Sequence, residues 1–262
     1  MELERLSTGV KELDRILGGG IPRGFLVAVA GEPGTGKTIL CLHFAWQGVL
    51  EGDRVVYVTT EESRGSVLRQ AEVLGMKLGE AVEGGKAVVI DALLGTDKWS
   101  LRSLNPEDLV QKVVEAKREL GYGRARLIID SMSAFWLDKP AMARKYSYYL
   151  KKVLHKWDFT IMATTQYAIS TSEAFGFGLE HIADGIIRFR RVVRGGRLRR
   201  FLLVEKMRQT PHDLRMYEVL IEPGRGMRLV GPVEYRAEDF ALPSSVSKKI
   251  MEARRRVEEE VP

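Results

Sequence analysis

The chain has 262 residues, of which 45% are hydrophobic and 29% charged, and its formal net charge is +6. This composition excludes an intrinsically disordered chain, and the length suits one large α/β domain whose sheet is covered on both faces. No apolar run approaches the roughly 20 residues of a membrane-spanning helix, residues 1–5 do not resemble a secretory signal, and a single cysteine, Cys41, excludes an internal disulfide framework. We therefore expect a cytoplasmic protein without a membrane partner. The positive charge permits a polyanionic partner such as nucleic acid without requiring one.

Apolar runs alternate with amphipathic segments along the chain, which is the order typical of an α/β domain with a mostly parallel sheet. Strands are expected over residues 25–30, 54–60, 87–91, 125–130, 160–165, 185–190, 198–204, 217–221 and 227–230. Helices are expected over residues 10–17, 39–45, 63–75, 105–120 and 138–157. The last four strands are predicted to form two antiparallel hairpins, the first of them with a Gly-Gly turn. We expect one domain over residues 1–240, and a charged tail or helix over residues 241–262.

Residues 31–38, Gly-Glu-Pro-Gly-Thr-Gly-Lys-Thr, join the first long strand to a helix and have the form G-x-x-x-x-G-K-[ST]. The glycines let backbone N–H groups turn inward around phosphate oxygens, and the positive end of the helix lies toward the same oxygens. Lys37 is placed to reach the β- and γ-phosphates, and the Thr38 hydroxyl to ligate magnesium. The sequence therefore predicts a nucleotide site, with phosphate-loop residues Gly31, Pro33, Gly34, Thr35, Gly36, Lys37 and Thr38.

Polar side chains end three further strands, where they face the crevice that holds the ligand in open α/β sheets. Glu61 and Glu62 come first, and either can align the water that attacks the γ-phosphate; alternatively, the pair only begins a helix. Asp130 ends an apolar strand and is expected to hold magnesium opposite Thr38. Gln166 follows another strand, where it either bonds the γ-phosphate or is a solvated loop residue.

The penultimate hairpin concentrates positive charge in the arginines Arg188, Arg190, Arg191, Arg194, Arg197, Arg199 and Arg200. They could contact nucleic-acid phosphates. The alternative, which we favour, is a sheet edge kept soluble by charge. The preceding segment, residues 166–183, is long for a loop inside a compact domain, which is typical of a functional or mobile segment.

Several patterns now stand in order along the chain. They are S-T-G, L-D and G-G-G over residues 7–20, the phosphate loop, T-T-E-E at 59–62, L-I-I-D-S at 127–131, H-I-A-D-G-I at 181–186, and V-E-K-M-R at 204–208 followed by His212. Together they resemble a single-domain KaiC-like ATPase of the RecA/RadA superfamily, of the archaeal type. The resemblance covers about residues 5–232.

This resemblance implies a RecA-like fold and a ring, usually a hexamer, that holds ATP and Mg²⁺ between neighbouring subunits. Glu61 and Glu62 match the catalytic carboxylates. Lys206 and Arg208 match the basic residues that a neighbour inserts toward the γ-phosphate, with His212 beside the nucleotide. A cation supplied in trans stabilises charge on the transferring phosphoryl group. The preference for ATP over GTP rests on the resemblance alone.

Two departures from the family pattern limit what carries over. KaiC proper has two fused ATPase domains, whereas this chain has one. Glu180 and His181 stand where the self-phosphorylating domain has adjacent Ser and Thr, so we expect hydrolysis without autokinase activity.

We therefore expect a magnesium-dependent ATPase ring whose nucleotide state controls an unknown regulatory protein. The alternative is a RadA-paralogue-like protein of recombination that binds single-stranded DNA through the arginine hairpin and residues 166–180, where Tyr167, Phe175 and Phe177 offer stacking surfaces. A third hypothesis is a nucleotide-binding switch with negligible turnover.

Overall fold

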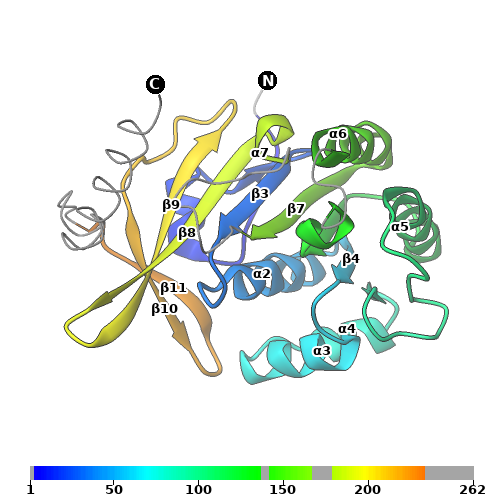
Figure 1. The fold of residues 1–262 in the computed structure, drawn as a ribbon, viewed down its shortest axis with the longest axis horizontal. Helices are drawn as coiled ribbons and strands as arrows, with labels where there is room; N and C mark the ends of the chain where they lie inside the picture. The colour runs from blue at the N-terminus through cyan, green and yellow to red at the C-terminus, as the bar shows by residue number, and fades with distance from the viewer. Residues whose placement is uncertain (1–2, 137–141, 167–178, 234–262) are drawn as a thin grey trace, which may run out of the picture.

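The computed structural model describes residues 3–136, 142–166 and 179–233, which fold around one large sheet (Figure 1). The nine strands of this sheet are β3 (Leu26–Gly31), β4 (Arg54–Thr59), β5 (Ala87–Asp91), β6 (Ala125–Asp130), β7 (Phe159–Gln166), β8 (Gly185–Arg194), β9 (Arg197–Met207), β10 (Tyr217–Glu222) and β11 (Gly226–Val230). Their order is β11-β10-β9-β8-β3-β7-β6-β4-β5. The strands from β5 to β8 in this order pair in parallel, and those from β8 to β11 are antiparallel. The predicted fold class is thereby confirmed.

Helices cover both faces of the sheet, as Figure 1 shows. They are α1 (Lys11–Ile16), α2 (Lys37–Leu50), α3 (Arg64–Val73), α4 (Leu78–Glu83), α5 (Pro106–Leu120), α6 (Ala143–Leu154) and α7 (Leu179–Ile182), with 3₁₀ turns at Met132–Trp136 and His155–Trp157. None of the described helices is long and apolar enough to cross a membrane.

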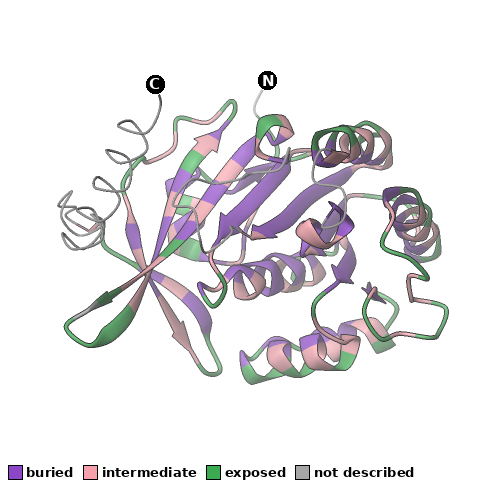
Figure 2. Ribbon diagram, in the orientation of Figure 1, coloured by how far each residue is buried: buried purple, intermediate pink, exposed green. Residues whose placement is uncertain are grey.

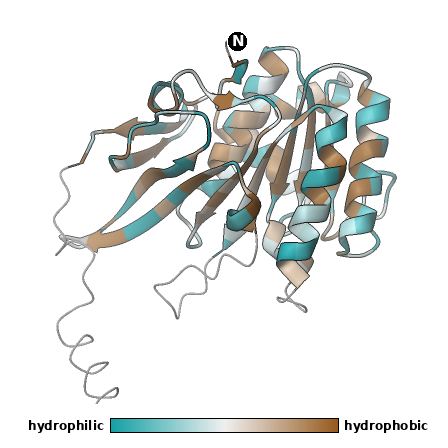
Figure 3. Ribbon diagram, turned by 90° about the horizontal axis from the view of Figure 1, so that it is seen from above, coloured by the Kyte–Doolittle hydropathy of each residue, from teal (hydrophilic) through white to brown (hydrophobic). Residues whose placement is uncertain are grey.

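Successive side chains along each strand point to opposite faces of the sheet, so alternate residues pack against different helices. Val27 and Val29 of β3 pack with α1 to α4, whereas Leu26 and Ala28 pack with α5 and α6. β3 is buried along its whole length (Figure 2), and Figure 3 shows hydrophobic strands enclosed between the helices. Because the sheet is covered on both sides, its central strands read as continuous apolar runs rather than as alternating patterns.

The N-terminal S-T-G and L-D pattern builds a compact turn. The Asp14 carboxylate accepts hydrogen bonds from the Ser7 hydroxyl (2.5 Å), the Thr8 hydroxyl (2.6 Å) and the Thr8 amide (2.7 Å). Gly20 has φ +122°, and a Cβ there would overlap the carbonyl of Leu6 in the short sheet formed by β1 (Arg5–Leu6) and β2 (Ile21–Pro22). These residues therefore fix the lead-in segment, on the side of the sheet that α2 covers.

The structure differs from the sequence prediction mainly in short elements. The strands lie where they were predicted, but the hairpin β8–β9 is longer than expected, reaching Arg194 and Met207. Helix α4 and the 3₁₀ turn after β6 were not predicted, because six or fewer residues carry too little periodicity to detect. The predicted tail, residues 241–262, lies outside the described residues, as does part of the predicted helix 138–157.

Candidate active site

The phosphate loop joins β3 to α2 and carries the predicted glycines in left-handed conformations. Gly34 has φ +76° and Gly36 has φ +107°. A Cβ on Gly36 would lie 3.2 Å from Cε of Met227, in β11. Glycine therefore satisfies both the backbone conformation and the close packing of the hairpin beside the loop. The result is a backbone cradle at the start of α2, which is the arrangement that binds phosphate groups.

Lys37 lies at the centre of this cradle. Its ammonium donates hydrogen bonds to the carbonyls of Gly31 (2.8 Å) and Glu32 (2.9 Å), and the residue is only 8% exposed. Burial lowers the pKa of Lys37, while Asp130 and Glu61 oppose that shift. An anion in the cradle would meet a charge that is already desolvated, so the attraction between the two is strong.

Asp130 is held at the end of β6 by two hydroxyl groups from neighbouring strands. The Thr164 hydroxyl donates to Oδ1 (2.6 Å) and the Tyr57 hydroxyl to Oδ2 (3.0 Å). Burial, followed by the Asp130 charge, raises the pKa of Tyr57, so its hydroxyl stays a donor. Neither partner was found from the sequence, because each depends on which strands are adjacent.

The two adjacent glutamates point to different places. Nε2 of Gln166 donates to both carboxylate oxygens of Glu61, at 2.6 and 2.7 Å. Glu62 instead accepts a hydrogen bond from the Ser66 hydroxyl (2.6 Å), in the first turn of α3. Partial desolvation and the nearby Asp130 charge raise the pKa of Glu61. Glu61 thus interacts with Lys37, Asp130 and Gln166, whereas the side-chain hydrogen bond of Glu62 is to Ser66 in α3.

Lys206 and Arg208 lie at the opposite edge of the sheet. Nζ of Lys206 donates to the carbonyl of Ala183 (2.7 Å), and the guanidinium of Arg208 pairs with Asp184 at 3.3 Å. Asp184 also accepts from the amide of Leu26 (3.0 Å), which is the first residue of β3. The phosphate loop follows the other end of this strand, about 16 Å away for a six-residue strand. Both cations are therefore remote from the phosphate loop of their own chain.

His212 lies on the same remote side, between β9 and β10. Its Nδ1 is 3.1 Å from the carbonyl of Thr210, while Nε2 is buried and has no hydrogen-bond partner among the described residues. The side chain of Arg208 is 55% exposed. This end of the sheet thus carries the exposed guanidinium of Arg208 and a His212 ring with one nitrogen that has no hydrogen-bond partner among the described residues.

Most arginines of the β8–β9 hairpin whose side chains are described are engaged within the chain. Arg199 pairs with Glu218 (2.5 Å), and Arg188 pairs with Glu205. Two others contact the phosphate loop, which the sequence analysis missed. Nε of Arg200 donates to the carbonyl of Gly34 (2.9 Å), and Nε of Arg191 lies 3.6 Å from a carboxylate oxygen of Glu32. These contacts hold part of the hairpin's positive charge within the chain. The hairpin is not at the edge of the sheet, because β10 and β11 lie beyond β9, so the predicted role of charge at a sheet edge does not apply to these strands.

The DNA-binding alternative depends on three aromatic residues that lie outside the described residues, namely Tyr167, Phe175 and Phe177.

The two residues that stand in place of the adjacent Ser and Thr of the self-phosphorylating domain, Glu180 and His181, lie in α7. Burial, followed by the charge of Glu205, raises the pKa of Glu180 to about 7.

Comparisons with known proteins agree on one family. The family described as "ATPase: KaiC" matches residues 6–234. A UPF0273 protein of Thermotoga maritima is 34% identical over 223 residues, covering 82% of this chain and 91% of the relative. A UPF0273 protein of Methanopyrus kandleri is 36% identical over 225 residues, covering 83% and 88%. Among solved structures, a KaiC-like protein of the hyperthermophilic archaeon Pyrococcus horikoshii matches with a TM-score of 0.75 and 25% identity, covering 88% of this chain and 100% of that chain.

Proposed function

Because the chain belongs to the KaiC family of ATPases, we propose that it is a magnesium-dependent enzyme that hydrolyses ATP to ADP and phosphate within a ring of identical subunits. Both the family and the geometry of the phosphate loop support nucleotide binding. The observation that carries the proposal is the convergence of Lys37, Asp130, Glu61 and Gln166 at one edge of the sheet. The nucleotide state of the ring would control an unknown regulatory protein.

In this proposal the phosphate-loop amides and Lys37 bind the phosphates of ATP. The residues present also suit Mg²⁺, since the Thr38 hydroxyl and the Asp130 carboxylate are the hard oxygen ligands that it prefers. Asp130 is oriented by two hydroxyl donors, as ligating carboxylates usually are. When bound, Mg²⁺ neutralises charge on the phosphate oxygens.

Glu61 is the group that we assign to the attacking water. Its carboxylate accepts the proton that the water loses as the oxygen attacks the γ-phosphate, and ADP leaves with the electron pair of the broken bond. The raised pKa of Glu61 makes it a stronger base than an ordinary glutamate. Gln166 holds this carboxylate by two hydrogen bonds and is therefore a positioning residue.

The reaction is completed by the next subunit in the ring. Lys206 and Arg208 are too far from their own phosphate loop to stabilise charge there, and Arg208 is exposed and available to a neighbour. A cation inserted in trans is worth roughly a thousandfold or more in rate. We assign His212 to the same contact, beside the neighbour's nucleotide. Hydrolysis would then depend on assembly, which supports a regulatory role.

The contrast between the two glutamates gives the test of this proposal. Phosphate release should fall by about 10²- to 10⁴-fold in Glu61→Gln, the range for loss of a general base. Glu62→Gln is the matched control, because it changes the same charge one residue away at a group that bonds Ser66 instead. We expect the control to retain activity within about threefold, since the hydrogen bond that it loses is made to α3 and not to a group that the proposal places on the phosphates. Equal losses in the two variants, or no phosphate release by the unaltered protein with ATP and Mg²⁺, would refute the assignment.

A further inference from the structure

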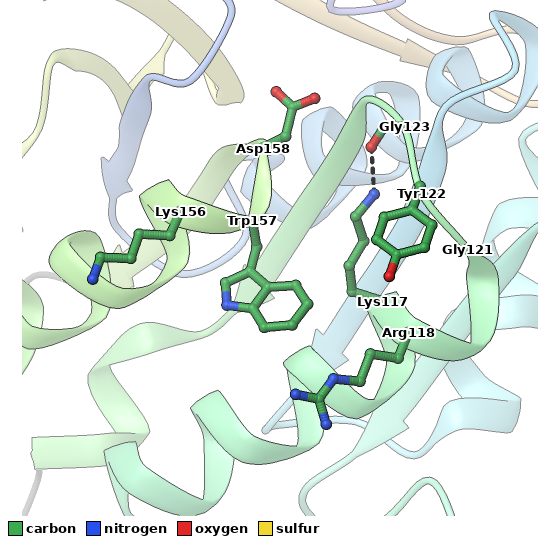
Figure 4. Close-up of a pocket in the computed structure, with 8 residues that line it drawn as sticks. All are labelled: Lys117, Arg118, Gly121, Tyr122, Gly123, Lys156, Trp157 and Asp158. Atoms are coloured by element: carbon green, nitrogen blue, oxygen red, sulfur yellow. Dashed lines mark hydrogen bonds between the residues drawn. The ribbon is translucent and has the colours of Figure 1, made fainter.

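A cavity lies on the side of the molecule away from the phosphate loop. Its volume is about 610 Å³, within the range of small-molecule sites. The end of α5, the turn at residues 121–123 and the 3₁₀ turn before β7 line it (Figure 4). Because these segments precede β6 and β7, the cavity is at the edge of the sheet where the parallel strands begin. Nothing in the proposed reaction uses it.

The cavity is positively charged. Lys117 is 5% exposed and donates a hydrogen bond to the carbonyl of Gly123. Arg118 and Lys156 form no ion pair with any described residue, in a chain where many other arginines are paired. The carboxylate that lines the cavity, Asp158, is held by Nε and Nη2 of Arg23 at 2.8 and 2.5 Å, so its charge is neutralised from outside. The residues that line the cavity thus include three cationic side chains and one carboxylate, which is already paired with Arg23.

The cavity also has two aromatic walls. The guanidinium of Arg118 lies 5.3 Å from the centre of the Trp157 ring. Tyr122 is 97% exposed, an unusual environment for so large an apolar ring. In Figure 4 the side chain of Lys117 lies between the rings of Trp157 and Tyr122, and Arg118 lies below them. Rings arranged in this way offer stacking surfaces to a planar ligand, and the guanidinium adds a cation–π contact.

We propose that this cavity binds a nucleoside phosphate. The base stacks against Trp157 and Tyr122, and the phosphate is bound by Arg118 and Lys156. An aliphatic anion would leave the rings unused, and a neutral aromatic ligand would leave the cations unpaired. The site goes beyond ATP hydrolysis, because it lies on the opposite edge of the sheet and shares no residue with the phosphate loop.

The test separates the two sites by removing the first. In a full-length Lys37→Ala protein, which cannot hold phosphates in the loop, we would titrate adenosine, guanosine and cytidine monophosphate by calorimetry. We expect at least one of them to bind with one site per chain, with an affinity that weakens as salt rises.

Two pairs of variants on this background identify the cavity. Arg118→Ala/Lys156→Ala should weaken binding at least tenfold, whereas Arg144→Ala/Lys145→Ala, an equal charge change at the far end of α6, should leave it unchanged. Tyr122→Ala should weaken binding about tenfold, the amount expected for one stacking contact. Tyr148→Ala, a second exposed tyrosine at 63%, is its control. Both members of each pair are at exposed positions, so loss of folding does not account for a difference.

Several results would overturn the proposal. One is no binding of any monophosphate up to the low-millimolar range. Another is equal weakening in test and control variants. Binding only of a 5′-phosphorylated oligonucleotide, or only of an acidic peptide with an aromatic residue, would likewise show that the cavity does not hold a free nucleotide.

Discussion

Arg126 is a fully buried charged residue that packs beside α2. It is 0% exposed, and its guanidinium donates to Asp53 (2.6 Å) and Glu51 (2.5 Å). The same group donates to the carbonyls of Ser7 (2.6 Å) and Phe44 (3.1 Å), and so joins β6 to α2 and to the N-terminal turn. A change to methionine keeps most of the volume and removes every one of these bonds.

The structure sets the size of the effect. Asp53 is 3% exposed, so Arg126→Met leaves a carboxylate buried with only part of its compensation. Breaking a buried ion pair in this way costs about 3–5 kcal/mol of unfolding free energy. At about 2–4 °C per kcal/mol for a chain of this size, the melting temperature should fall by about 10 °C. Arg124→Met is the comparison variant. Arg124 also bonds Asp53, but its side chain is 25% exposed, whereas Arg126 is fully buried and also donates to two backbone carbonyls, so the loss of Arg124 should cost less, about 1–3 kcal/mol.

Urea unfolding of the two variants and the unaltered protein, followed by circular dichroism, measures both values. The reasoning depends on the contrast rather than on either number alone. If Arg126→Met destabilised the protein no more than Arg124→Met does, the buried network would not be holding the N-terminal turn and α2 to the sheet.

Two further predictions concern the same helix and turn. Burial lowers the pKa of His43 to about 4 from 6.5, and its Nε2 accepts a hydrogen bond from the amide of Met227 (2.7 Å). His43 binds a proton more readily in the unfolded chain than in the folded one, so the free energy of unfolding should fall by about 3 kcal/mol as pH drops from about 6.5 to 4. Urea titrations at several pH values measure this dependence. If His43→Gln showed the same pH dependence, the prediction would be contradicted. Asp14→Ala removes three hydrogen bonds from the N-terminal turn and should lower the free energy of unfolding by about 1–3 kcal/mol. Proteolysis at residues 3–20 should then be faster, and an unchanged rate would show that Asp14 does not hold this turn in place.

The sequence was sufficient for the parts of the site that are contiguous in the chain. The phosphate loop, with Lys37 at its centre, is a local pattern of glycines between a strand and a helix, and the strand ends at Asp130 and Gln166 followed from apolar runs. The sequence could not show which of Glu61 and Glu62 bonds Gln166. The directions in which these two adjacent side chains point depend on the turn that leads into α3.

The remaining contacts required tertiary neighbours. Thr164 reaches Asp130 only because β7 lies beside β6, and Arg200 reaches Gly34 only because the β8–β9 hairpin packs beside the phosphate loop. Arg126, near the start of β6, is fully buried although it is charged, because its partners come from α2, the turn after it and the N-terminal turn. No local periodicity encodes any of these pairings.

The central claim is that each active site is built from two subunits, with the phosphate loop and Glu61 on one and Arg208 on the next. The most direct test is phosphate release by rings co-expressed from Glu61→Gln and Arg208→Ala chains, each inactive alone. We predict partial recovery, which in a closed ring mixed one to one corresponds to about a quarter of the sites having neither defect. No recovery at any mixing ratio, in rings that contain both chains, would contradict the claim.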